Sequence, residues 1–139
     1  DIARDCLKAL GLEHLAKRSL QTLSGGELRR VEIARLLTQQ TPLSLLDEPT
    51  NHLDLAHQAD CIRVLRSQCV SDKRAMLLVV HDLNLAYRNC DHWLILDGDG
   101  RWQAGTRESL GDSKRLSAAY AHPISRIDGD DGPIFVAGL

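Results

Sequence analysis

The sequence predicts an α/β fold in which helices flank a parallel sheet. Residues 43–46 and 75–80 form two short, mostly apolar runs, and each run stops at polar residues. Runs of this kind between turn signals are typical of buried strands in a parallel sheet. A segment of helical periodicity, residues 55–70, separates them. Strand, helix and strand in this order indicate a right-handed crossover between parallel neighbours.

The remaining elements follow in order from local signals. Apolar residues at helical spacing predict helices over residues 2–10, closed by Gly11, and over residues 27–39 after a polar connection. Asp82 is a natural N-cap for a short helix over residues 83–89. Further short helices are expected near residues 107–110 and 113–120.

Two hairpins complete the predicted fold. A strand over residues 92–96 is followed by the turn sequence Asp97-Gly98-Asp99-Gly100 and can pair with residues 101–104. A smaller hairpin is expected over residues 124–136, around the turn sequence Gly-Asp-Asp-Gly at residues 129–132. The predicted fold is therefore an α/β core with small β-hairpins at its C-terminal end.

Composition narrows the class of protein. The chain has 139 residues, a net charge of −2 and only 4% aromatic residues, which argues against a nucleic-acid surface. No apolar stretch approaches the roughly 20 residues that span a bilayer, and the charged first residues do not resemble a signal peptide. The four cysteines form no metal-site spacing, so we expect buried, reduced thiols and a cytosolic setting. The chain lacks an initiating Met and begins inside a predicted helix, so we interpret it as a fragment.

Two adjacent carboxylates, Asp47 and Glu48, follow the first predicted strand. Ligands of open α/β sheets bind beyond the carboxyl ends of the strands. One carboxylate facing a metal and one facing a water would suit metal-assisted hydrolysis. By themselves the two residues are also consistent with a strand that ends in solvated acids.

Residues 24–27 (Ser-Gly-Gly-Glu) precede the second predicted helix and allow two interpretations. Ser-x-x-Glu is a capping box, in which Ser24 and Glu27 exchange hydrogen bonds at the helix start. Capping does not need two glycines, however, and bare backbone N–H groups at the positive end of a helix suit a phosphate. Both interpretations can hold together.

His81 follows the second predicted strand, at the sheet edge where Asp47 and Glu48 are expected. An imidazole there can donate a hydrogen bond to a phosphate or hold an attacking water. A structural or solvated histidine is the alternative.

The order of these features resembles the ATPase domain of ABC-type transporters. Residues 23–27 (LSGGE) resemble the signature motif, and residues 43–48 (LSLLDE) resemble the Walker B strand. Residues 50–54 (TNHLD) resemble the D-loop, and His81 resembles the switch histidine. The resemblance implies a P-loop NTPase-like fold, with ATP and Mg²⁺ as the expected cofactors.

The resemblance also implies a role for each catalytic residue. Asp47 would hold Mg²⁺ through water. Glu48 would act as the general base for the water that attacks the γ-phosphate, and His81 would contact that phosphate.

The binding residues follow from the same resemblance. The signature residues Ser24, Gly25 and Gly26 would bind the γ-phosphate of a nucleotide held mainly by the other subunit of a head-to-tail dimer, and Glu27 would belong to the same nucleotide-binding motif. Asp54 would lie at the dimer interface and couple the two sites.

The sequence also departs from the family pattern. It contains no G-x-x-x-x-G-K-[ST] phosphate loop, which the family carries in its N-terminal half. We therefore interpret the chain as the C-terminal part of one ATPase domain whose N-terminal half is missing. Residues 1–40 would form the signature-motif region, 41–105 the catalytic core and 106–139 a C-terminal extension.

Residues 81–86 (HDLNLA) and 53–58 (LDLAHQ) resemble the importer subfamily that handles iron chelates, haem and cobalamin. That resemblance implies transmembrane permease subunits as partners, a periplasmic binding protein as an indirect one, and a peripheral location on the cytoplasmic face of the inner membrane. Residues 50–54 are also common in the soluble, ribosome-associated ABC-F branch. An inactive, truncated remnant is a third interpretation.

Overall fold

The computed structural model describes residues 1–71 and 73–138. The chain divides into two compact units, Asp1–Val79 and Val80–Leu139. Both units contain helices and strands, and the first contains a parallel pair of strands, which confirms the predicted α/β class.

The first unit holds the parallel pair of strands. Its elements are α1 (Ile2–Ala9), the 3₁₀ helices η1 (Glu13–Leu15) and η2 (Leu20–Thr22), α2 (Gly25–Thr38), β1 (Leu43–Asp47), α3 (Leu55–Ser71) and β2 (Ala75–Val79). Strands β1 and β2 pair in parallel, from Leu43 opposite Ala75 to Asp47 opposite Val79. The predicted strand–helix–strand crossover is confirmed. The two short 3₁₀ helices were not predicted.

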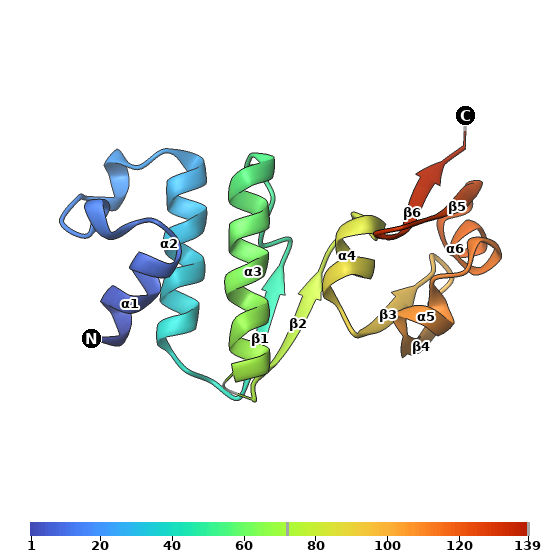
Figure 1. The fold of residues 1–139 in the computed structure, drawn as a ribbon, viewed down its shortest axis with the longest axis horizontal. Coiled ribbons are helices and arrows are strands. Elements are labelled where there is room, and N and C mark those ends of the chain that lie inside the picture. The colour runs from blue at the N-terminus through green and yellow to red at the C-terminus, as the bar shows by residue number, and fades with distance from the viewer. Residues whose placement is uncertain (72, 139) are drawn as a thin grey trace. The chain divides into compact units, whose positions relative to one another are not determined.

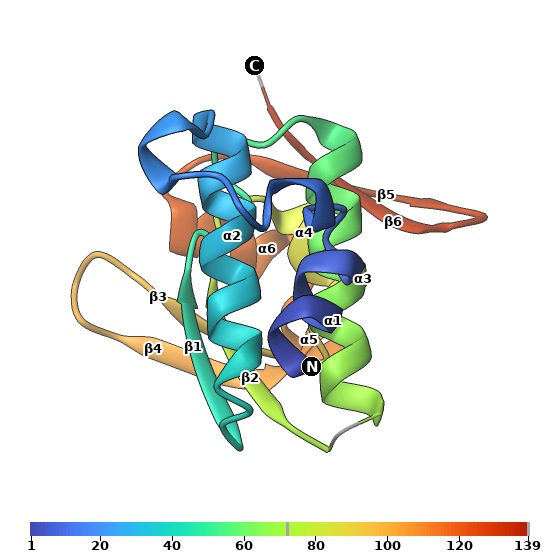
Figure 2. The ribbon, with the colours of Figure 1, turned by 90° about the vertical axis from the view of Figure 1, so that its left-hand side faces the viewer.

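Helices α2 and α3 lie on one face of this two-stranded sheet (Figures 1 and 2). Side chains along β1 therefore alternate, and Leu46 is 8% exposed whereas its neighbour Leu45 is 66% exposed. The expectation of a strand buried on both faces is wrong for this structure, because the described chain covers one face only. The buried Ser44 hydroxyl is paired with Thr41 Oγ1 at 3.1 Å, so its polar atom is satisfied.

The buried side of α2 consists of Ile33, Ala34 and Leu37. Apolar residues recur at helical spacing at positions 28, 31, 34 and 37, which predicts one buried face, but Leu28 is exposed at the start of the helix. At the end of α1, Gly11 has φ +69°, a left-handed conformation that favours glycine after a helix.

The second unit consists of two antiparallel hairpins and three helices. Its elements are α4 (Leu83–Asn89), β3 (His92–Leu96), β4 (Trp102–Thr106), α5 (Arg107–Leu110), α6 (Ser113–Tyr120), β5 (Ile124–Gly129) and β6 (Gly132–Ala137). Strand β3 pairs with β4, and β5 pairs with β6. Asp82 caps α4 by accepting hydrogen bonds from the backbone N–H groups of Asn84 and Leu85. Both predicted hairpins and the predicted cap are confirmed.

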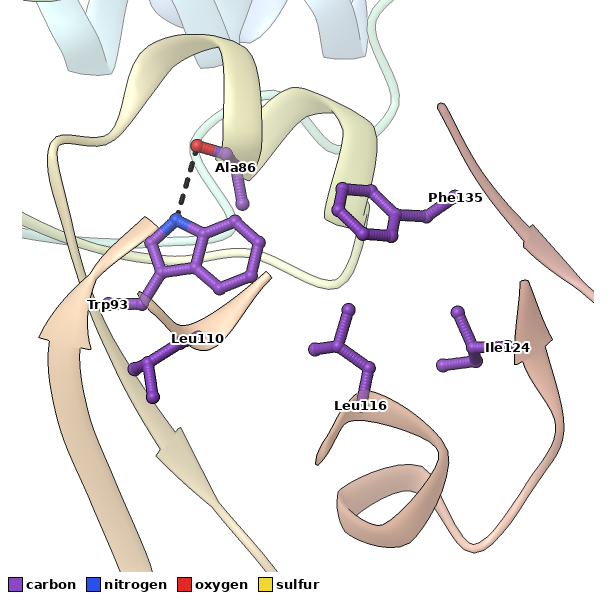
Figure 3. Close-up of a cluster of buried hydrophobic side chains, with 6 residues drawn as sticks. All are labelled: Ala86, Trp93, Leu110, Leu116, Ile124 and Phe135. Carbon is purple, nitrogen blue, oxygen red and sulfur yellow. Dashed lines mark hydrogen bonds between the residues drawn. The ribbon is translucent and has the colours of Figure 1, made fainter. Parts of the chain in front are cut away.

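One apolar core joins the elements of the second unit (Figure 3). The helices α4, α5 and α6 and the strands β3, β5 and β6 each contribute one buried residue. These residues are Ala86, Trp93, Leu110, Leu116, Ile124 and Phe135. The indole Nε1–H of Trp93 donates to the carbonyl oxygen of Ala86 at 3.3 Å, so the one polar atom of that side chain is satisfied.

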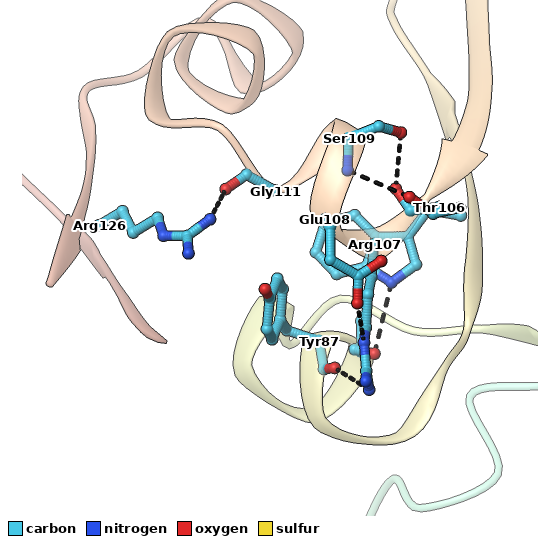
Figure 4. Close-up of polar contacts among 9 residues, drawn as sticks. Tyr87, Thr106, Arg107, Glu108, Ser109, Gly111 and Arg126 are labelled. Carbon is cyan, nitrogen blue, oxygen red and sulfur yellow. Dashed lines mark hydrogen bonds and ion pairs between the residues drawn. The ribbon is translucent and has the colours of Figure 1, made fainter. Parts of the chain in front are cut away.

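Two arginines surround the ring of Tyr87 at the edge of this core (Figure 4). The guanidinium carbons of Arg107 and Arg126 each lie 5.6 Å from the ring centroid. Arg107 also donates to the carbonyl oxygen of Tyr87 at 3.1 Å, and Arg126 donates to that of Gly111 at 2.8 Å. These contacts tie α4 to α5 and to β5.

The cysteines only partly meet the expectation of burial. Cys61 is fully buried, whereas Cys6, Cys69 and Cys90 are partly buried. Within the described part of the chain, no helix is both long enough and apolar enough to span a membrane.

Candidate functional site

The N-terminus of α2 carries the predicted capping box. Ser24 Oγ accepts from the backbone N–H of Glu27 at 3.3 Å, and Glu27 Oε2 accepts from the backbone N–H of Ser24 at 2.8 Å. The hydrogen bond from the Ser24 backbone holds the pKa of the Glu27 carboxyl below its ordinary value of 4.5. The capping interpretation is confirmed.

Neither glycine after Ser24 is required by packing. A Cβ atom at Gly25 would meet nothing within 4 Å, and one at Gly26 would make ordinary contacts with Leu53 and His52. Both have room for a side chain, and neither has the positive φ that favours glycine. The backbone at the start of α2 is thus accessible to a ligand.

Asp47 is the last residue of β1 and Glu48 follows it, so both residues lie at the carboxyl end of the strand, as predicted. The N–H of Glu48 donates to the carbonyl oxygen of Val79 at 2.9 Å, which extends the pairing with β2 by one residue. Glu48 then adopts φ +44°, a left-handed conformation that is unusual for a residue with a side chain. The chain turns there, and the side-chain amide of Asn51 donates to Glu48 Oε2.

Arg29, on the second turn of α2, joins the two predicted motifs. Its Nη2 atom donates to the carbonyl oxygens of Asp47 and Glu48, at 2.6 and 2.8 Å. Its Nη1 atom pairs with Glu32 at 3.0 Å. Sequence reasoning missed Arg29. The one available signal was its position four residues after Gly25, which places both on one face of the helix.

These residues line one open cleft of about 460 Å³ in the first unit. The first turns of α2 contribute Gly25 and Arg29, and the end of β1 with its following loop contributes Asp47, Glu48 and Asn51. The structure therefore brings the predicted phosphate-binding helix end and the predicted carboxylates to the same cleft.

Asp54 lies at the start of α3 and does not line that cleft. Its carboxylate accepts from the backbone N–H of His57 at 2.9 Å and pairs with His57 Nδ1 at 2.8 Å. The backbone hydrogen bond from His57 holds the pKa of Asp54 below its ordinary value of 3.8. In this structure Asp54 acts as a helix cap.

His81 belongs to the second unit, just before α4. It lines an open hollow of about 400 Å³, together with residues that include Tyr120, His122 and Phe135. The other predicted site residues all belong to the first unit.

Among the residues that the structure describes, no three His, Cys, Asp or Glu side chains cluster as metal ligands. Mg²⁺ does not need such a cluster, because proteins commonly hold it through one or two carboxylates together with waters and substrate phosphates. The carboxylate of Asp47 beside an open cleft fits that mode of binding.

Comparisons with known proteins agree with the resemblance. Residues 1–51 match the model of the ABC transporter family. The hemin import ATP-binding protein HmuV of Nocardia farcinica is 38% identical over 128 residues, which are 92% of this chain and 44% of that protein. The cobalamin import ATP-binding protein BtuD of Halobacterium salinarum is 42% identical over 111 residues, which are 79% of this chain and 28% of that protein.

A solved structure of a metal-chelate type ABC transporter in an inward-facing conformation has the same fold. It superimposes with a TM-score of 0.87 at 29% identity, over 99% of this chain and 57% of that one. The chain spans less than half of the length of both curated relatives. It belongs to the ABC transporter ATP-binding family.

Proposed function

We propose that the chain is the C-terminal part of an ATP-hydrolysing subunit that energises an importer of iron-siderophore complexes, haem or cobalamin. The observation that carries the proposal is the cleft of the first unit, where the open glycine backbone of α2 meets the carboxylates that end β1. Relatives named for hemin and cobalamin import support the substrate class.

Glu48 would act as the general base toward the water that attacks the γ-phosphate. A base must be held within hydrogen-bond reach of the proton that it removes. The backbone of Glu48 is fixed by Val79 and Arg29, and its carboxylate accepts from the Asn51 amide. This fixed carboxylate suits phosphoryl transfer, which depends on positioning and charge neutralisation more than on covalent chemistry.

Asp47 would hold Mg²⁺, which when bound neutralises charge on the phosphates. Ser24, Gly25 and Gly26, with Glu27 closing the cap, would present backbone N–H groups to the γ-phosphate of a nucleotide on the partner of a head-to-tail dimer.

Two further residues would complete the site. Asp54 would lie at the dimer interface, and its position at the start of α3 keeps it on a fixed helix end. His81 would contact the γ-phosphate from the loop before α4. Permease subunits at the cytoplasmic face of the membrane would be the partners of the dimer, with a periplasmic binding protein acting through them.

The test is Glu48→Gln in a complete ATP-binding subunit that carries these residues. Loss of a general base typically lowers the rate about 10²- to 10⁴-fold, so we expect turnover to fall by that factor while ATP binding is retained. Glu13→Gln, at an exposed glutamate of η1, is the matched control and should leave turnover unchanged. Unchanged turnover in Glu48→Gln would defeat the role given to Glu48.

The soluble ABC-F-type factor is the competing function, favoured by residues 50–54. A second ATPase domain fused to the same polypeptide would support it, whereas a permease gene beside the coding sequence would support the importer. For this chain alone we expect no saturable ATP binding at micromolar nucleotide, since it carries no phosphate loop. Isothermal titration calorimetry measures this directly.

A further inference from the structure

We propose that Arg29 is a positioning residue for ATP hydrolysis, because it holds the backbone of Asp47 and Glu48 in the conformation from which their carboxylates act. The inference rests on the proposed function and adds to it a residue outside the motifs that the sequence resembles. Arg29 lines the same cleft. Its effect on hydrolysis would come through the peptide groups that carry the two carboxylates.

The hydrogen bonds of Arg29 are directed at two consecutive peptide groups. A single nitrogen, Nη2, donates to Asp47 O at 2.6 Å and to Glu48 O at 2.8 Å. Hydrogen bonds from a charged donor are shorter and roughly twice as strong as neutral ones. Glu32, one helical turn further along α2, pairs with Nη1 and fixes the orientation of the guanidinium group.

This arrangement depends on the left-handed conformation of Glu48. In an extended strand, successive carbonyl groups point to opposite sides, so one donor cannot reach both. With Glu48 at φ +44°, the carbonyl oxygens of Asp47 and Glu48 lie on the same side and one nitrogen can bind both. Arg29 therefore stabilises the left-handed state against the extended conformation that a residue with a side chain otherwise prefers.

Two neighbouring hydrogen bonds fix the rest of the turn. The N–H of Glu48 donates to Val79 O at 2.9 Å, and the N–H of Asn51 donates to Glu48 O at 3.1 Å. Without Arg29, Asp47 O and Glu48 O would each lose a charged donor, and Glu48 O would keep its bond from the neutral Asn51 N–H. The Glu48 carboxylate would then be carried by a less restricted backbone, and misplacement by about 1 Å can lower a rate by about 10²-fold.

Arg29 also connects two functions that the head-to-tail dimer separates. It lies on the helix whose N-terminus would bind the partner's nucleotide, and it holds the carboxylates that would act on this subunit's nucleotide. The linkage is direct, since the α2 side chain contacts the end of β1 without an intermediate.

The first experiment measures steady-state ATP hydrolysis by a complete ATP-binding subunit that carries these residues. We expect Arg29→Ala to lower kcat by about 10- to 100-fold and to leave KM for ATP within about threefold, because positioning affects the chemical step more than nucleotide binding. Arg29→Lys places one charged nitrogen near both carbonyl groups and should recover at least several-fold of the loss. Arg35→Ala, at an exposed arginine of the same helix, is the matched control and should match the wild type.

The second experiment measures amide hydrogen exchange on the chain as it stands, without nucleotide. We expect Arg29→Ala to speed exchange at the N–H groups of Glu48 and Asn51 by at least about tenfold, with α3 unchanged. Unchanged α3 shows that the variant is folded.

The two experiments separate the inference from the proposed function. If the wild type hydrolyses ATP and Arg29→Ala keeps its kcat within twofold, the role of Arg29 is refuted. If the wild-type subunit does not hydrolyse ATP, the proposed function fails. The exchange rates then decide the inference: faster exchange at the Glu48 and Asn51 amides in Arg29→Ala supports positioning of the turn by Arg29, and unchanged exchange refutes it.

Discussion

Asn84 joins the helix that follows His81 to the last strand of the chain. Its side-chain Nδ2 donates to Phe135 O at 3.1 Å, and its Oδ1 accepts from Phe135 N at 2.7 Å, across 51 residues of sequence. A net hydrogen bond contributes about 1 kcal/mol, and an unpaired buried group costs about 1–3 kcal/mol. Asn84 is partly buried, and so are its two hydrogen bonds to Phe135. We therefore expect Asn84→Ala to lower the free energy of unfolding of the second unit by about 2 kcal/mol.

Urea denaturation followed by tryptophan fluorescence measures this loss. Both tryptophans of the chain, Trp93 and Trp102, lie in the second unit. The ring centroids of Trp93 and Phe135 are 6.4 Å apart. Asn89→Ala is the matched control, since Asn89 lies on the same helix and donates to a carbonyl oxygen of that helix, Leu85 O. If the unfolding free energies of the two variants agree within about 0.5 kcal/mol, the hydrogen bonds between Asn84 and Phe135 contribute less to stability than we expect.

Three further predictions concern packing and ionisation. Gly111→Ala should lower the unfolding free energy of the second unit by about 1–3 kcal/mol, because the added Cβ would lie 2.7 Å from the backbone oxygen of Arg107 and 2.8 Å from the ring of Tyr87. Gly98→Ala is the control: its Cβ would meet nothing within 4 Å, so it should be neutral in the same denaturation assay. Burial raises the pKa of Cys61 to about 11, so iodoacetamide at pH 8 should label the partly buried Cys6 in the native chain and leave Cys61 unmodified until urea unfolds it. The neutral Cys61 thiol contributes stability below its ordinary pKa of 9.0, and this contribution is lost as the pH rises from 9.0 toward 11. In a Cys61→Ser variant the unfolding free energy should no longer show this fall between pH 9.0 and 11. The pKa of Glu27 is lowered, so its carboxylate contributes stability above pH 4.5, and this contribution is lost as the pH falls below 4.5. A carboxyl NMR titration of Glu27 with a midpoint at or above pH 4.5 would contradict the capping geometry.

Short-range signals accounted for most of the secondary structure. Ser24 and Asp82 cap their helices because a side-chain oxygen two or three residues before a backbone N–H can reach it in any chain that turns there. Gly-Asp-Asp-Gly at residues 129–132 closes the last hairpin for a similarly local reason. The family resemblance came from motif order, and the comparisons confirmed it.

Contacts between distant residues could not be read in the same way. Arg29 reaches carbonyl groups 18 and 19 residues away, and no local pattern marks an arginine that binds backbone from one that faces solvent. The exposure of Leu43 and Leu45 was also missed, because an apolar run does not state how many faces of its strand the chain can cover.

The sequence by itself determined the order of helices and strands, the caps, the hairpin turns and the family, because these depend on residues that are near one another along the chain. Tertiary structure alone decided that α2 meets the end of β1 through Arg29, that Glu48 turns left-handed there, and that the open glycine backbone shares a cleft with Asp47 and Glu48. The physical reason is that these features depend on which groups packing brings within hydrogen-bond distance, and spacing along the sequence does not encode that distance.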